Sequence, residues 1–222
     1  MVSYNFIAGS EIIKMLSELE IQLDFQISPK GFLVEFQQID KGLVVQKNID
    51  SAKISYSKTN EIARGILLLQ TNFSKENFEI KQECAFKDFA FSVDMSRNAV
   101  MKTSALKDIV RHISLLGYNS LMLYTEDTIK VSGEEYFGYM RGALSPTEVK
   151  EIEDYCGIFG IELVPCIQTL AHINQITRYQ NYEKITDVDD ILLADDERTY
   201  ELLDNIFKTI SECYSSKKIN IG

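Results

Sequence analysis

The chain has 222 residues, of which 45% are hydrophobic and 10% aromatic, so it can bury a sizeable core and is not a disordered chain. Its net charge of −10 argues against nucleic acid or an anionic membrane surface as the partner. No apolar run approaches the ~20 residues of a membrane span, and the start of the chain lacks the pattern of a signal peptide. We therefore expect a cytoplasmic protein.

The first 88 residues predict a small α+β domain, because helical spacing of apolar residues gives way to period-two alternation and then returns. The expected helices lie at residues 9–20 and 57–69, and the expected strands at 21–27, 32–38, 43–45 and 51–56. Turns at Pro29–Gly31 and Asp40–Gly42 separate these strands, so we expect an antiparallel sheet of three or four strands with helices. No catalytic grouping falls in this part.

From Phe89 onward, strands and helices alternate, which is the pattern of an α/β protein with a parallel sheet. The expected strands lie at residues 89–93, 120–124, 161–167 and 218–222. The expected helices run over residues 103–116, 145–159 and 195–215, the second with Ser145, Pro146 and Glu148 as a capping box. We thus divide the chain into residues 1–88 and 89–222.

Charged residues follow three of these strands at their C-terminal ends, where βα barrels carry their chemistry. Asp94 and Arg97 follow the first strand, Glu126 and Asp127 the second, and His172 the third. A long polar loop then precedes the last helix, and long loops are often functional. The pattern predicts a site built from the strand ends.

The four cysteines, Cys84, Cys156, Cys166 and Cys213, lie far apart in segments that otherwise predict strand or helix. No CxxC or His-rich spacing indicates zinc. We expect buried reduced thiols, with a disulfide as the open alternative, and neither a metal nor an organic cofactor.

Four stretches, in order, resemble glycoside hydrolase family 20, the exo-β-N-acetylhexosaminidases, and most of all its cytoplasmic bacterial members. They are Phe91–Asn98, which resembles the family's Asp-x-x-Arg motif, Asn119–Asp127, Phe137–Ser145 and Ile161–His172. The α+β domain before them also resembles the small domain that these enzymes carry ahead of the barrel. Departures from the family's usual residues favour a divergent subgroup; they include Glu126, Cys166, Gln168 and Ala171.

The resemblance implies that residues 89–222 are strands one to four, the first half, of a (β/α)₈ TIM barrel. It implies removal of terminal GlcNAc or GalNAc from glycans by substrate-assisted retaining catalysis, without a cofactor. The family's catalytic Asp-Glu pair follows the fourth strand, in a motif that Asn220-Ile221-Gly222 would open. We therefore expect a truncated chain that is inactive alone, with an exposed barrel edge that allows dimerisation or aggregation. An open α/β sheet is the alternative.

The resemblance also assigns roles to the residues at the strand ends. Arg97 would hold hydroxyls of the terminal sugar, since its guanidinium fork suits two neighbouring oxygens, although a salt bridge with Asp94 is the structural alternative. Asp94 and Glu126 would also contact the sugar. Asp127 and His172 would form a relay that tunes the absent acid, with Glu126 as the other candidate partner of His172.

Several tyrosines in the loops either stack on sugar rings or simply pack; they are Tyr136, Tyr139, Tyr179 and Tyr182. Two other classes of protein stay open. One is a different barrel hydrolase whose catalytic carboxylates are Asp94 and Asp127. The other is a non-enzymatic α/β interaction module.

Overall fold

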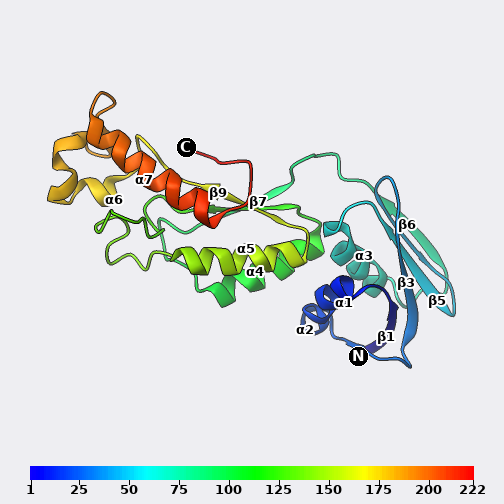
Figure 1. Cartoon of the computed structure of the whole chain (residues 1–222). Coiled ribbons are helices and arrows are strands. Elements are labelled where there is room, and N and C mark those ends of the chain that lie inside the picture. The colour runs from blue at the N-terminus through cyan, green and yellow to red at the C-terminus, as the bar shows by residue number, and fades with distance from the viewer. The chain divides into compact units, whose positions relative to one another are not determined.

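A computed structural model describes residues 1–222, which form two compact units (Figure 1). The first unit comprises residues 1–90, 107–120 and 155–161, and the second comprises residues 91–106, 121–154 and 162–222. The division that we predict after residue 88 stays a prediction. None of the helices is long and apolar enough to cross a membrane.

The first part of the chain supplies six strands and three helices. In chain order these are β1 (Val2–Ile7), α1 (Ser10–Ser17), α2 (Glu20–Leu23), β2 (Phe25–Ile27), β3 (Phe32–Gln38), β4 (Leu43–Lys47), β5 (Ser51–Tyr56), α3 (Asn60–Thr71) and β6 (Phe78–Gln82). The predicted strands at residues 32–38 and 51–56 are confirmed to the residue. Strands β1 and β6 were not predicted.

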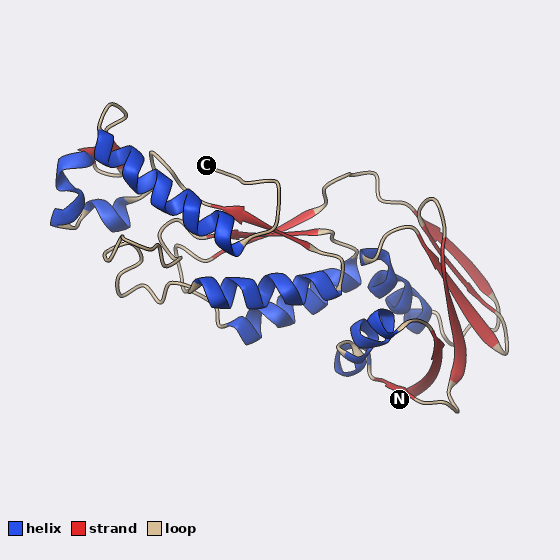
Figure 2. Cartoon of the chain, viewed as in Figure 1, coloured by secondary structure: helices blue, strands red, loops and turns tan.

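The six strands form one mixed sheet in the order β2-β1-β3-β5-β4-β6. Strand β1 is parallel to β2 and β3, and β3 is parallel to β5; only β4 runs antiparallel, to β5 and β6. The prediction of an antiparallel sheet of three or four strands is therefore wrong. Helix α3 packs against β4 and β5, α1 packs on α3, and Figure 2 shows the helices on one side of this sheet.

The turn at Pro29–Gly31 does not make the hairpin that its sequence favours, because it carries the chain across β1. Strands β2 and β3 both pair with β1, one on each side, and meet it at Tyr4. A Cβ atom on Gly31 would lie 2.5 Å from the carbonyl carbon of Tyr4, so only glycine allows this crossing. Residues 21–23, predicted as strand, belong to helix α2 instead, which leaves Ile21 exposed and Leu23 buried.

The second part of the chain alternates strands and helices as predicted. Its elements are β7 (Ala90–Asp94), α4 (Thr103–Leu116), β8 (Ser120–Tyr124), α5 (Pro146–Ile158), β9 (Glu162–Cys166), α6 (Asn174–Thr177), the 3₁₀ helix η1 (Gln180–Ile185), β10 (Thr186–Val188), β11 (Ile191–Leu192) and α7 (Glu197–Cys213). The bounds of α4 and β8 match the prediction to the residue. Ser145 and Glu148 form the predicted capping box at the start of α5.

Strands β7, β8 and β9 form a second sheet in that order. The amide of Asn119, just before β8, donates to the carbonyl of Phe89, just before β7, and the amide of Met95 donates to the carbonyl of Tyr124 at the other end. Because like ends meet, β7 and β8 are parallel. The predicted strand at residues 218–222 is reduced to a single parallel bridge between Asn220 and Cys166.

The four cysteines are all free thiols. Cys156, Cys166 and Cys213 are buried, as we expect of structural thiols, but Cys84 is exposed. Burial raises the pKa of the Cys166 thiol, so this group is a poor nucleophile.

Candidate functional site

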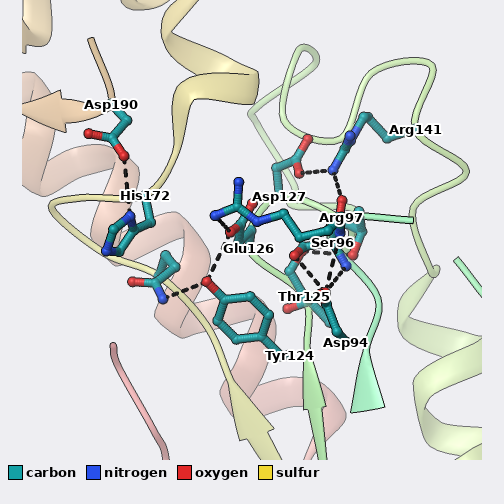
Figure 3. A network of polar contacts seen from close by, with 12 residues as sticks. Asp94, Ser96, Arg97, Tyr124, Thr125, Glu126, Asp127, Arg141, His172 and Asp190 are labelled. Carbon is teal, nitrogen blue, oxygen red and sulfur yellow. Dashed lines mark hydrogen bonds and ion pairs between the residues drawn. The ribbon is translucent and has the colours of Figure 1, made fainter. Parts of the chain in front are cut away.

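Asp94, the last residue of β7, organises the turn that follows this strand (Figure 3). Its Oδ1 accepts hydrogen bonds from the amide and hydroxyl of Ser96, at 2.8 and 2.7 Å, and from the amide of Arg97 at 3.2 Å. Desolvation raises the pKa of Asp94, but these bonds and the charge of Arg97 outweigh it and hold the pKa below its ordinary value. Asp94 thus fixes the backbone that carries Arg97.

The guanidinium of Arg97 pairs with Glu126 rather than with Asp94. Nη2 of Arg97 lies 2.8 Å from Oε1 of Glu126, the second residue after β8. The side chain of Glu126 is 1% exposed, whereas that of Arg97 is 52% exposed. A buried carboxylate therefore anchors Arg97 at the strand ends while part of its donor fork still faces solvent.

Tyr124 and Gln168 complete this chain of contacts and were not predicted as site residues. The Tyr124 hydroxyl donates to Oε1 of Glu126 at 2.9 Å and accepts from Nε2 of Gln168, also at 2.9 Å. Burial first, and then the bond to Glu126, raises the pKa of Tyr124, so its hydroxyl remains a donor. The network therefore joins the ends of three strands. Each member stands at or just after the end of a predicted strand, and this position in the sequence could have identified Tyr124 and Gln168 as site residues.

The second oxygen of Glu126, Oε2, is buried and has no hydrogen-bond partner. The backbone of Glu126 has φ +46°, in the left-handed region that non-glycine residues rarely adopt. A buried acceptor without a donor is costly, and such groups gather at functional sites. Glu126 therefore combines two features that fold stability alone does not favour.

Asp127 belongs to a neighbouring pair that includes Arg141, from the loop between β8 and α5. Nη2 of Arg141 lies 3.2 Å from Oδ1 of Asp127 and also donates to the carbonyl of Ser96. Burial raises the pKa of the Asp127 carboxyl above its ordinary value, and the charge of Arg141 opposes this. Arg141, a lone cation between Gly138 and Gly142, thus ties the turn after β7 to the end of β8.

His172 does not contact Asp127 or Glu126, contrary to the predicted relay. Its Nδ1 lies 3.2 Å from Oδ2 of Asp190, and its side chain is 62% exposed. Figure 3 shows the His172–Asp190 pair on one side of the cluster and the Asp127–Arg141 pair on the other. The chain has φ +59° at His172, which turns it away from the strand, and both acids already have arginine partners. The predicted catalytic and binding roles themselves stay predictions.

Asp94 and Asp127 each have a partner within the fold, and their assignment as the catalytic carboxylates of a different hydrolase stays a prediction. Asp94 holds the turn at Ser96, and Asp127 is buried against Arg141. No group of three His, Cys, Asp or Glu side chains is placed to hold a metal ion. What the strand ends present is an anchored arginine beside a buried carboxylate, an arrangement suited to a neutral ligand rich in hydroxyl groups.

These features define an α/β protein with a polar site at the C-terminal ends of a parallel sheet. Solved glycoside hydrolase family 20 enzymes share its fold, so the predicted resemblance to that family is confirmed at the level of the fold. An exo-β-N-acetylglucosaminidase from Vibrio harveyi, solved with N-acetylglucosamine, matches the whole chain with a TM-score of 0.81 at 12% identity. An N-acetyl-β-hexosaminidase from Streptomyces plicatus, solved with Thio-NAglucal, matches the whole chain with a TM-score of 0.81 at 15% identity.

The chain spans 43% and 54% of these two enzymes, respectively. Among curated proteins, human Hexosaminidase D is 28% identical over 92 residues, which are 41% of this chain and 19% of that protein. No family model matches the sequence. At these identities the structural likeness establishes the fold, and the activity has to be argued from the site.

Proposed function

We propose that this chain is the N-terminal portion of a glycoside hydrolase that removes terminal N-acetylhexosamine from glycans. The observation that carries the proposal is Arg97, half exposed and anchored by the buried carboxylate of Glu126, in a fold shared with family 20 enzymes. The free guanidinium N–H groups of Arg97 would donate to two neighbouring hydroxyls of the terminal sugar. The unpartnered Oε2 of Glu126 would accept from one of them.

The second sheet would then be the beginning of a (β/α)₈ barrel, with β7, β8 and β9 as its first three strands and the segment at Asn220 as the fourth. In substrate-assisted retaining catalysis, the acetamido group of the sugar acts as nucleophile and a carboxylic acid protonates the leaving oxygen. Asp94 already holds the turn at Ser96, Glu126 holds Arg97 and Asp127 holds Arg141, so we assign none of them the role of that acid. We therefore propose that the 222 residues alone bind the sugar and do not cleave it.

Asp127 and His172 would support the acid rather than act as the acid. The buried Asp127, whose pKa is raised, would stabilise a positively charged neighbour or share a proton with the acid. His172 is 62% exposed and pairs with Asp190 through Nδ1, so its ring would be open to a further partner. Asp94 would contribute only by holding the turn that carries Arg97.

Binding of N-acetylglucosamine to the chain, measured by ligand-observed NMR titration, tests this proposal. We expect weak binding, and we expect Arg97→Ala to weaken it about tenfold or more, because the substitution removes charged hydrogen bonds worth about 1.5–3 kcal/mol. Arg64→Ala is the matched control, since Arg64 is an arginine of α3 whose Nε donates to Gln82 in the first unit. It should bind like the unmodified chain.

Hydrolysis of p-nitrophenyl N-acetyl-β-glucosaminide tests the second half of the proposal. We expect no release of p-nitrophenol above the buffer rate. Release at the rate of a complete hexosaminidase would show that the catalytic acid lies within the chain. Absence of sugar binding, or binding that is indifferent to Arg97→Ala, would refute the proposed sugar site.

A further inference from the structure

Three tyrosines from two loops far apart in the sequence gather into one aromatic cluster. Tyr136 and Tyr139 lie between β8 and α5, and Tyr179 lies between α6 and η1. The ring centroids are 5.4 Å apart for Tyr136 and Tyr139, 5.2 Å for Tyr136 and Tyr179, and 5.9 Å for Tyr139 and Tyr179. These are the separations of rings in contact, and the ring planes are tilted to one another by 52°, 40° and 88°, respectively. We call this aromatic cluster the tyrosine platform.

The tyrosine platform is partly open to solvent, since Tyr139 is exposed and Tyr136 and Tyr179 are half-buried. Tyr139 is 44% exposed and the adjacent Met140 is 88% exposed. The guanidinium of Arg178 lies 5.0 Å from the ring of Tyr179 and donates to its hydroxyl, which stiffens this edge of the platform. Tyr182, by contrast, is a core residue, because it is fully buried and its hydroxyl donates a hydrogen bond to Glu134. Exposed aromatic surface of this kind marks binding surfaces more often than chance.

The platform directly adjoins the polar cluster at the strand ends. A Cβ atom on Gly138, between Tyr136 and Tyr139, would lie 2.5 Å from the carbonyl oxygen of Asp127, so the loop rests on the end of β8. Arg141, from the same loop, pairs with Asp127. The charge of Arg178 also acts on the Asp127 carboxylate, which places the second loop near the same residue. The loop that carries Tyr136 and Tyr139 therefore contacts the residue next to Glu126.

We propose that the tyrosine platform binds the pyranose ring of the sugar residue that is linked to the terminal one. This inference rests on the proposed function, because it takes the Arg97–Glu126 pair as the site of the terminal sugar. A pyranose ring has a face of C–H groups and a rim of hydroxyls. Its apolar face suits the exposed rings, and its rim suits the tyrosine hydroxyls and Arg178. The platform would thus make the protein select glycans of two or more residues.

Titrations of the 222-residue chain with N-acetylglucosamine and with its β-1,4-linked disaccharide, followed by ligand-observed NMR, test this inference. We expect the disaccharide to bind about tenfold more tightly, the effect of one or two good ring contacts. In the variant Tyr136→Ala/Tyr139→Ala, the ratio of the two affinities should fall to about one. Tyr200→Ala is the matched control, because Tyr200 is 52% exposed on α7, and it should keep the ratio.

The variant Tyr136→Phe/Tyr139→Phe is the control for misfolding of the alanine variant, because it keeps both aromatic rings. It should retain most of the preference for the disaccharide. Equal affinities for the two sugars in the unmodified chain, or an unchanged ratio in the alanine variant, would overturn the platform while leaving the proposed function intact. Loss of the preference in the phenylalanine variant would likewise refute ring stacking.

Arg97→Ala separates the two proposals. If it abolishes binding of both sugars while the tyrosine variants affect only the preference, both proposals hold. If the Arg97→Ala variant still binds the disaccharide and only the tyrosine variants lose this binding, the result supports the tyrosine platform and refutes the sugar site at Arg97. If neither sugar binds to the unmodified chain, both are refuted.

Discussion

Neutralising Glu134 should destabilise the second unit of the protein. Glu134 lies in the loop after β8, and its side chain is only 2% exposed. Its Oε2 accepts from Nη2 of Arg198 at 2.6 Å and from the Tyr182 hydroxyl at 3.1 Å, and its Oε1 accepts from Nδ2 of Asn205 at 2.9 Å. The carboxylate thus joins the loop to η1 and α7, and Glu134→Gln turns its amide N–H₂ toward groups that are themselves donors.

The size of the effect follows from the burial of the two partners. Breaking a buried ion pair by changing one partner typically costs about 3–5 kcal/mol. Arg198 is 35% exposed, so water solvates part of the guanidinium that Glu134→Gln leaves unpaired. The amide also keeps one oxygen as an acceptor. We therefore expect a loss of about 2–3 kcal/mol in the free energy of unfolding at neutral pH.

This loss should depend on pH with a defined sign. Desolvation raises the pKa of Glu134, but the bonds from Arg198 and Asn205 outweigh it and lower the pKa below the ordinary value of 4.5. A lowered pKa in the folded state means that the stabilisation is complete above the unfolded pKa and is lost as the pH falls through the folded pKa. The difference between the unmodified chain and Glu134→Gln should therefore be greatest near neutral pH and shrink below about pH 4.5.

Urea unfolding followed by circular dichroism at several pH values measures this difference. The matched control is Asp154→Asn, because Asp154 is 71% exposed and lies 3.6 Å from Lys150, so it should change the free energy by less than about 0.5 kcal/mol. If Glu134→Gln costs no more than this control, the buried carboxylate does not hold the loop. A cost that stays constant as the pH falls would instead show that the effect is steric.

Two further predictions concern the start of α5 and the second sheet. Ser145→Ala removes the hydroxyl that donates to Glu148 and accepts from its amide, so it should lower the free energy of urea unfolding by about 1 kcal/mol, and an unchanged value would show that the capping box is dispensable. Apolar side chains stay exposed at both edges of the second sheet: Phe91 of β7 is 36% exposed, and Ile219, next to the bridge at Asn220, is 40% exposed. We therefore expect self-association that grows with concentration in sedimentation velocity; a single monomeric species at all concentrations would contradict it.

The helices of the second part were predictable because their signals are local. Helix α4 has an apolar stripe that ends at Gly117, and α5 starts with a capping box, so neighbours in the sequence decide both helices. The mixed sheet of the first part was not predictable in the same way. Whether β3 pairs with β1 and β5 or forms a hairpin with β2 depends on contacts between distant segments, and the turn at Pro29–Gly31 favours the wrong answer. Val2–Ile7 does show the period-two alternation of a strand, so β1 could have been found.

The site residues were likewise predictable only where the local sequence determines their position. That Asp94, Arg97, Glu126 and Asp127 gather at the strand ends follows from the order of strands and helices. Which carboxylate meets which arginine does not follow, because it depends on the backbone after each strand. At Glu126 the chain takes φ +46°, and there Glu126 faces Arg97 while Asp127 faces Arg141. Neither residue is a glycine, so the sequence does not indicate a left-handed backbone at this position.

The same left-handed backbone at Glu126 bears on the proposed sugar site. Holding a non-glycine residue at positive φ costs about 1–3 kcal/mol, and the buried Oε2 without a donor adds to that cost. The bonds to Arg97 and Tyr124 offset part of it, but both go to Oε1. A donor that reached the buried Oε2 would offset the remaining cost, which is the role that the proposed site gives to a sugar hydroxyl.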